Sequence, residues 1–200
     1  FMAGEVSRPG SYSVSGLTTL TQGLYLSGGI SDLGSFRNIE LLRDGELIQK
    51  YDLYKLLLEG DTSGDQRLRS GDVVFVNTSG PKVSIEGEII RPAIYEVDSN
   101  ETLSDLVSMA GSLSSRAFLK GATLQRYDKN SGQPVILNVN IGEPKNLEIE
   151  LRDGDAFFIP SVTETLSNPV EITGAAVRPG LYAWENGFTF TDYISSFEQD

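Results

Sequence analysis

The chain has 200 residues, 39% of them hydrophobic and 22% charged, with a formal net charge of −12. This composition is ordinary for a soluble globular chain, and the acidic balance argues against binding of a nucleic-acid backbone. The sequence contains no histidine and no cysteine, so it lacks the commonest general base, the commonest metal ligand and all thiol chemistry.

The first segment, GEVSRPGSY at 4–12, predicts a β-hairpin. We expect its first strand to end near Arg8, because proline fixes φ and donates no backbone hydrogen bond. The pair Pro9–Gly10 suits a type II turn, after which Tyr12 begins the returning strand.

A short helix should follow the hairpin. Leu20 and Leu24 lie on one face at helical spacing, and Gly28–Gly29 are expected to end the helix in the left-handed conformation.

Strands and a second helical segment complete this unit. Strands at 38–43 and 47–51 flank the turn Asp44–Gly45, a helical turn is expected at 53–58, and the apolar run at 73–76 is typical of a central strand. The order of hairpin, helix and strands predicts an α+β fold: a small mixed sheet packed on one helix, which is the β-grasp pattern.

The whole pattern recurs at an offset of 83 residues. Gly4 corresponds to Gly87, and Gly71 corresponds to Gly154, so the first two units align almost without gaps. The second helix is expected to start at Asn100 or Thr102, and its apolar face consists of Leu103, Leu106, Val107 and Ala110.

A third copy of the hairpin motif, GAAVRPGLY, occupies 174–182, and the sequence stops at Asp200. The expected organisation is unit one at 1–79, unit two at 80–161, a polar linker at 162–169 and a partial third unit at 170–200. We interpret the chain as a piece of a longer protein. Each unit is long enough to bury its own core, which predicts beads on a string rather than a solenoid.

Four stretches together resemble a known family: G-E-x-x-R-P-G-x-Y at 4–12, S-G-G-I at 27–30, I-E-L-L-R at 39–43 and L-R-S-G-D-V-V-F-V at 68–76. They are similar to SLBB (soluble-ligand-binding β-grasp) domains, and the tandem arrangement resembles the bacterial outer-membrane polysaccharide export proteins of the Wza-like family. The sequence shows no lipobox cysteine, no separate export-signature domain and no C-terminal membrane helix.

The resemblance implies a location and partners. SLBB domains of that family build part of a periplasmic, ring-forming export channel, so we expect association with the outer membrane through parts of the protein outside this sequence. Self-association of the full-length protein is implied, and polysaccharide and an inner-membrane polysaccharide copolymerase are candidate partners. No apolar run approaches the length of a membrane-spanning helix, so we expect no direct membrane insertion by this chain. Because the net charge is −12, we also expect no nucleic-acid partner.

Candidate contact residues lie at the hairpin tips. Arg8, Arg91 and Arg178 occupy one position in the three copies, either as glycan or subunit contacts or as donors to nearby carbonyls. In the third copy Tyr182 and Trp184 are candidates for stacking on a sugar ring. The residues aligned with Trp184 are both valine, which favours instead a strand position that faces the core.

The other polar residues singled out in the sequence are typical of structural roles, and we expect neither a cofactor nor a metal site. Glu5 and Glu88 correspond to Ala175, so this position does not require a carboxylate in every copy, which argues against catalysis there. Asp72 and Asp155 each follow a turn glycine and are expected to accept hydrogen bonds within the turn.

The leading interpretation is therefore a non-enzymatic pair of modules that assembles a polysaccharide export channel. The alternative is a receptor module for a carbohydrate or small ligand. A glycosidase with two catalytic carboxylates is a third interpretation, which the repeated architecture disfavours.

Overall fold

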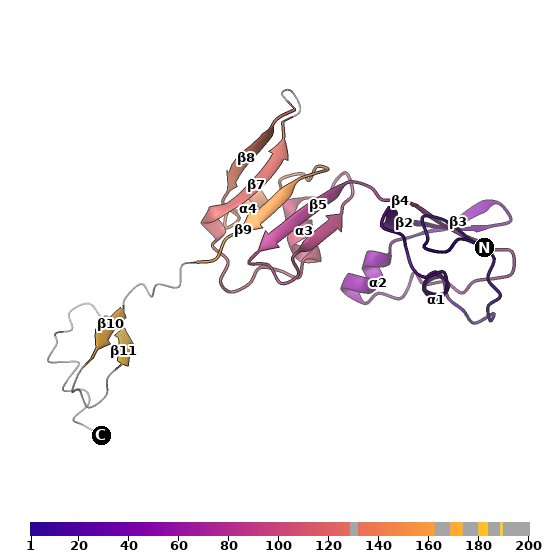
Figure 1. Cartoon of the computed structure of the whole chain (residues 1–200), viewed down its shortest axis with the longest axis horizontal. Coiled ribbons are helices and arrows are strands. Elements are labelled where there is room, and N and C mark those ends of the chain that lie inside the picture. The colour runs from indigo at the N-terminus through magenta and orange to yellow at the C-terminus, as the bar shows by residue number, and fades with distance from the viewer. Residues whose placement is uncertain (129–131, 163–168, 174–179, 184–188, 190–200) are drawn as a thin grey trace, which may run out of the picture. The chain divides into compact units, whose positions relative to one another are not determined.

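The computed structural model describes residues 1–128, 132–162, 169–173, 180–183 and 189. Residues 1–161 form one compact unit and residues 162–200 form another. The first unit contains two mixed β-sheets, each with short helices (Figure 1). This arrangement confirms the predicted α+β class with tandem β-grasp modules.

The first sheet has four strands in the order β1-β4-β2-β3. These are β1 (Met2–Gly4), β2 (Gly34–Arg43), β3 (Glu46–Tyr51) and β4 (Val73–Thr78). β1 and β4 are parallel, whereas β2 is antiparallel to both β3 and β4. Helix α1 (Leu20–Leu26) contributes Leu20 and Leu24 to a core that includes Ile39, Leu41 and Val76.

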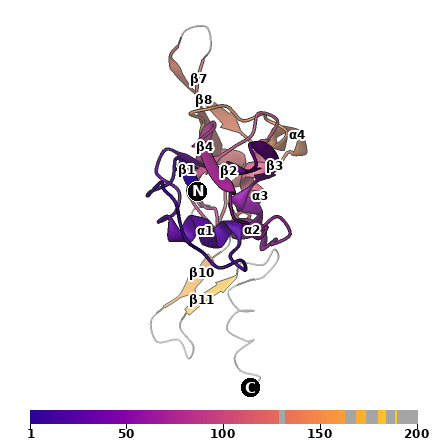
Figure 2. The same ribbon diagram turned by 90° about the vertical axis from the view of Figure 1, so that its right-hand side faces the viewer.

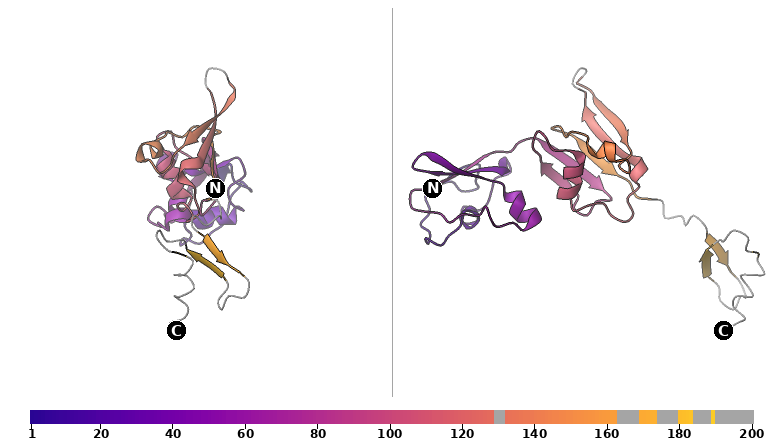
Figure 3. Two further views of the ribbon diagram at one scale, coloured as in Figure 1. Left: turned by 90° about the vertical axis from the view of Figure 1, so that its left-hand side faces the viewer. Right: turned by 180° about the vertical axis from the view of Figure 1, so that it is seen from behind.

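The second sheet has five strands in the order β6-β5-β9-β7-β8. These are β5 (Lys82–Gly87), β6 (Ala93–Glu96), β7 (Ala122–Tyr127), β8 (Pro134–Val139) and β9 (Ala156–Ile159). Helices α3 (Leu103–Met109) and α4 (Pro144–Leu147) lie on the same face of this sheet, as the view from behind shows (Figure 3). The 3₁₀ turn η1 (Leu119–Gly121) leads into β7. Leu103 and Leu106 are buried against Ile85 and Leu124, so the predicted apolar helix face is confirmed.

The start of α3 and the ends of α1 and α3 follow the predicted signals, whereas the cap at the start of α1 was not predicted. Thr19 caps α1 with Gln22, and Thr102 stands at the start of α3, where its backbone N–H donates to Asp105. Gly28 and Gly111 close these helices with φ of 84° and 82°, a region open to glycine at little cost. The segment predicted to be helical at 53–58 is α2 (Leu53–Glu59).

The first strand ends earlier than predicted. β1 ends at Gly4 rather than near Arg8, and β5 ends at Gly87. Both glycines have positive φ, and a Cβ on Gly4 or Gly87 would lie only 2.1 or 2.0 Å from a backbone carbonyl oxygen of the neighbouring strand. The chain bends there, and the backbone N–H of Arg8 donates to Ser27 just beyond α1.

The predicted type II turn is also wrong. Gly10 has φ of 153° and exchanges two backbone hydrogen bonds with Met2, so it extends the pairing instead of forming the third position of a turn. In the second repeat the equivalent segment is the regular antiparallel pair β5–β6.

The offset of 83 residues holds at both ends of the two repeats but not between them, because one hairpin is longer and the connection after it is shorter. Ile39 and Ala122 occupy equivalent positions at an offset of 83, but their partners Tyr51 and Val139 are 88 residues apart. The β7–β8 hairpin is therefore five residues longer than β2–β3, and the connection to the last strand is correspondingly shorter. The prediction that the two units align almost without gaps is therefore wrong in the region of β3 and β8.

The second unit has a described antiparallel pair, β10 (Pro169–Ile172) and β11 (Gly180–Ala183). The boundaries predicted for the linker and the partial third unit stay predictions. Among the described residues, no helix has the length and apolar character needed to cross a membrane.

Candidate functional site

The predicted hairpin arginines lie beside the C-terminal ends of the helices. Arg91 donates from Nη2 to the carbonyl of Met109 over 2.9 Å, and its Nε would lie 3.2 Å from a Cβ on Gly111. Arg8 lies beside Gly28 in the same way, at 3.1 Å. A cation near the last carbonyls of a helix stabilises that helix end, so Arg91 has a structural partner in its own repeat. Both arginines are exposed, and their contact with a glycan or a subunit stays a prediction.

The spacing of arginine and tyrosine, which recurs in the copies of the motif, closes a local loop. The hydroxyl of Tyr12 donates to the carbonyl of Arg8 over 2.6 Å, and that of Tyr95 donates to Arg91 over 2.8 Å. Because Tyr95 is buried, its pKa is raised.

Three predicted contact residues belong to the third copy. Arg178 and Trp184 lie outside the described residues, and for Tyr182 the structure describes the backbone within β11. Their predicted roles stay predictions.

A buried arginine–aspartate pair recurs in both repeats. Arg43 donates to both carboxylate oxygens of Asp72 over 2.7 and 2.8 Å, and Arg126 does the same to Asp155 over 2.8 and 2.6 Å. The Asp72 and Asp155 side chains are 3% and 0% exposed. The hydrogen bond from Arg43 lowers the pKa of Asp72.

These aspartates also accept the predicted turn hydrogen bonds, from the backbone N–H groups of Arg69 and Arg152. Sequence reasoning found that turn role and missed the bidentate arginine. The signal was present, because arginine and aspartate both recur at the offset of 83.

The motif glutamates are also held locally. The hydroxyl of Ser31 donates to Glu5, and that of Ser114 donates to Glu88, whose pKa is lowered by this hydrogen bond. Among the described residues, no group of three or more acidic side chains is arranged to hold a metal ion.

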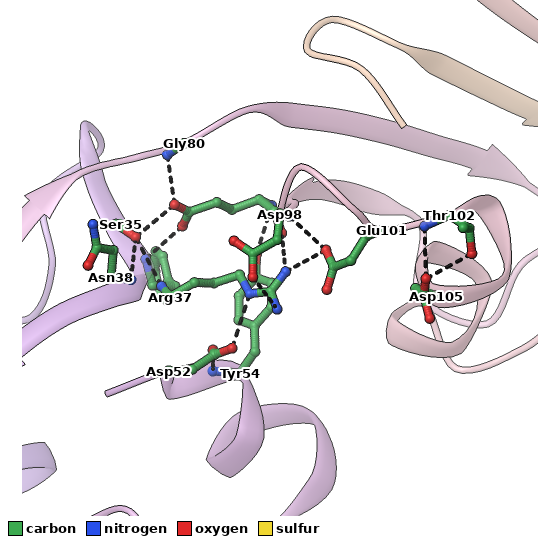
Figure 4. Close-up of polar contacts among 12 residues, drawn as sticks. Ser35, Arg37, Asn38, Asp52, Tyr54, Gly80, Asp98, Glu101, Thr102 and Asp105 are labelled. Carbon is green, nitrogen blue, oxygen red and sulfur yellow. Dashed lines mark hydrogen bonds and ion pairs between the residues drawn. The ribbon is translucent and has the colours of Figure 1, made fainter. Parts of the chain in front are cut away.

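A polar network joins the first repeat to the second (Figure 4). Arg37 in β2 forms ion pairs with Asp52 at 3.1 Å, with Glu101 at 2.6 Å and with Asp98 at 3.4 Å. Its guanidinium also lies 5.5 Å from the ring centroid of Tyr54. Burial alone would lower the pKa of Arg37, but the hydrogen bond to Glu101 and the surrounding carboxylates outweigh burial and raise it. The arginine is therefore a permanent cation at the centre of this junction.

A second element of the junction is the buried carboxylate of Glu96 in β6. It accepts hydrogen bonds from the hydroxyl of Ser35 and from the backbone N–H groups of Gly80 and Phe36, over 2.7, 2.7 and 2.9 Å. The backbone N–H of Glu96 in turn donates to the hydroxyl of Tyr54 over 3.1 Å. One residue of the second repeat is thus held by the first repeat and by the connection between the repeats.

Apolar contacts accompany the polar ones. Tyr54 and Leu58 of α2 pack against the core of the second repeat, and Tyr54 meets Tyr95 edge to face at 6.4 Å. The repeats are consequently not the independent beads that the sequence predicted. Repeat comparison could not reveal the junction, because positions equivalent to Ser35 and Arg37 hold Phe118 and Lys120.

An apolar hollow of about 230 Å³ lies in the first repeat next to this junction. Its walls include the exposed side chains of Tyr25 and Leu57, and also Phe36. With scarcely any polar group in its lining, the hollow suits an apolar group better than a sugar, which needs hydrogen-bond partners.

The model of the SLBB domain matches residues 1–50 and 82–138, which is more than half of the chain. The two matched segments start at the first strand of each sheet and end within β3 and β8, so they cover corresponding parts of both repeats.

Proposed function

Because the chain belongs to the SLBB domain family, we propose that it is a non-enzymatic pair of coupled modules in the periplasmic part of a polysaccharide export protein. In this role the modules assemble part of the wall of an export channel. Association with the outer membrane comes from other parts of the protein. The passing glycan and an inner-membrane copolymerase are the partners that this role requires.

The observation that carries the proposal is the junction around Arg37 and Glu96. Buried charges are favourable only when their partners keep a strict geometry, so such a network specifies one arrangement of the two modules. A wall element needs that property, whereas a receptor with one independent binding module does not.

The charge of the chain supports the same role. A net charge of −12 produces a surface that repels an anionic polymer, which favours passage over adhesion. Tight binding of an acidic capsule glycan that persists unchanged at high salt would contradict this part of the proposal.

A gene deletion tests the export role. In the source organism, removal of residues 1–161 from the chromosomal copy should abolish surface polysaccharide and cause it to accumulate in the periplasm. Complementation with the intact gene should restore export. Normal surface polysaccharide in the deletion strain, with the remaining protein present, would overturn the proposal.

The exposed ring of Tyr25 offers a face for stacking on a sugar, and the apolar hollow beside it suits a small apolar ligand. These two features favour one competing function, a receptor for a carbohydrate or small ligand. Calorimetry of the chain with the cognate glycan separates the two. A receptor requires saturable binding that Tyr25→Ala or Arg91→Ala removes, whereas a wall element shows no saturable heat.

A further inference from the structure

The turn that joins β6 to α3 has the sequence Asp-Ser-Asn-Glu-Thr at 98–102. Asn-x-Ser/Thr is the acceptor sequence for N-linked glycosylation. Oligosaccharyltransferases of the bacterial type also need an acidic residue two positions before the asparagine. Asn100 meets both requirements, because Thr102 follows it and Asp98 precedes it at the required spacing. None of the functions considered above uses Asn100.

The side chain of Asn100 is accessible to an enzyme. Asn100 is exposed, and its side chain makes no hydrogen bond with any residue that the structure describes. The backbone N–H of Glu101 donates to the carbonyl of Asp98 over 3.1 Å, which closes a turn at the surface. Exposed turns tolerate attached groups, because few packed contacts surround them.

Asn77 is followed by a hydroxyl residue, Ser79, but it lacks the other properties of Asn100. The residue two positions before it is Phe75. Asn77 lies in β4, between β1 and β2, and its Nδ2 donates to the backbone carbonyl of Asn38 over 3.1 Å. We therefore expect no modification of Asn77.

Asn130 has the acidic residue but lacks the hydroxyl. It follows Asp128 at the required spacing, whereas Gly132 occupies the position where serine or threonine is needed. Asn130 belongs to the segment that connects β7 to β8, and these two strands extend beyond the others of their sheet (Figure 2). The chain thus contains one complete acceptor sequence, at Asn100, and an incomplete one that a single substitution would complete.

The residues that a transferase must recognise are held by surface contacts. The side chain of Asp98 is 72% exposed, and its 3.4 Å contact with Arg37 is the longest ion pair of that arginine (Figure 4). The hydroxyl of Thr102 donates to the exposed Asp105 over 2.8 Å. Both contacts lie outside the core, so they can open locally without exposing the buried Leu103.

We propose that Asn100 is an acceptor site for N-linked glycosylation by an oligosaccharyltransferase of the bacterial type. The co-substrate is an oligosaccharide that is joined through pyrophosphate to a polyprenol lipid. Nδ2 of Asn100 forms a bond to the anomeric carbon of the first sugar, and the bond from that carbon to the pyrophosphate oxygen breaks, with its electron pair leaving on the pyrophosphate. One amide proton passes to a base of the transferase. This inference rests on the periplasmic location proposed above, because such transferases act outside the cytoplasmic membrane.

The test is expression of the chain in the periplasm of a host that contains such a transferase and its lipid-linked donor. The mass of the intact chain should increase by that of one glycan, and peptide mass spectrometry should locate the glycan on Asn100. Asn100→Gln should restore the unmodified mass, with circular dichroism unchanged because Asn100 is exposed. Asp98→Asn should lower the glycosylated fraction several-fold, whereas Thr102→Ser should retain it.

Gly132→Ser is the matched control, because it completes the acceptor sequence at Asn130 and should add a second glycan. Gly132 has positive φ, so circular dichroism is compared for this variant as well.

The proposal is overturned by a chain that stays unmodified in cells that glycosylate another acceptor protein, by modification that survives Asn100→Gln, or by a glycan on Asn77 in place of Asn100. The protein isolated from its source organism should carry the same glycan, and an unmodified Asn100 there overturns the proposal too. These outcomes are read from mass, whereas the deletion experiment is read from surface polysaccharide, so failure of one proposal is distinguishable from failure of the other.

Discussion

The two repeats bury equivalent cores and have the same length, but they divide their residues differently between the second hairpin and the connection that follows it. In the first repeat, the connection after β3 is long enough for α2, which places Tyr54 and Leu58 on the second repeat. In the second repeat, the additional residues lengthen the β7–β8 hairpin, and the following helix is only the short α4. A shift of five residues within a constant repeat length thus provides an internal junction in one copy and an open edge in the other.

The buried ion pairs are the strongest shared feature, and their removal should have the largest effect. Asp155→Ala leaves Arg126 buried without its carboxylate, which we expect to destabilise the second repeat by about 3–5 kcal/mol. Urea unfolding followed by circular dichroism measures the loss. Asp72→Ala is the matched variant in the first repeat, and its effect should be smaller because Arg43 is more exposed than Arg126. Equal effects would show that exposure does not distinguish the two pairs.

The second largest loss of stability is expected for substitution of Gly87, at the end of β5. Gly87→Ala forces a side chain into positive φ and toward the carbonyl oxygen of Ile159, so we expect a loss at the upper end of about 1–3 kcal/mol. Gly45→Ala is the control, because Gly45 also has positive φ but no atom near its missing Cβ. A Gly87→Ala loss no larger than that of Gly45→Ala would show that the close approach to β9 does not matter.

The third test asks whether Glu96 couples the two repeats at their junction. Glu96→Ala leaves the buried donors at Ser35, Phe36 and Gly80 without their acceptor, with an expected loss of about 2 kcal/mol. Because the junction couples the cores, unfolding should also separate into two transitions, visible by differential scanning calorimetry. Glu86→Ala removes an exposed glutamate of the same sheet and should change stability by less than about 0.5 kcal/mol. A single unchanged transition in Glu96→Ala would show that the network does not couple the repeats.

The smallest expected effect is a pH dependence of the first repeat. The pKa of Asp72 is lowered in the folded state, mainly by the hydrogen bond from Arg43. Its contribution to stability is therefore complete above the unfolded pKa of about 3.9 and is lost as pH falls through the lower folded value. Unfolding free energies at neutral pH and near pH 3 should differ less in Arg43→Met than in the unsubstituted chain. An identical pH dependence in both would contradict the assignment to this pair.

Local features of the fold were predictable from particular residues. Leu103, Leu106 and Gly111 predicted the position and end of α3, because helical spacing and a left-handed glycine are local properties. The Asp44–Gly45 turn has positive φ at both residues, as its sequence indicated. The strand end at Gly4 was missed, since the carbonyl oxygen of Val76 that requires glycine there comes from a strand far along the chain.

The candidate site was less predictable. Sequence comparison of the repeats selects residues that recur, and it pointed to Arg8 and Arg91. The residues that join the repeats, above all Arg37 and Glu96, occur once and carried no repeated signal.

The sequence by itself determined the α+β class, the two repeats and their helices. Hydrophobic spacing and turn glycines are local properties of the chain, and the offset of 83 residues can be measured from the sequence alone. Only the tertiary structure decided where Arg37 finds its carboxylates, which sheet edge is covered and which stays open. Those outcomes depend on contacts between residues distant in sequence, such as Ser35 with Glu96 and Arg37 with Glu101, and on a shift of five residues that the constant repeat length conceals.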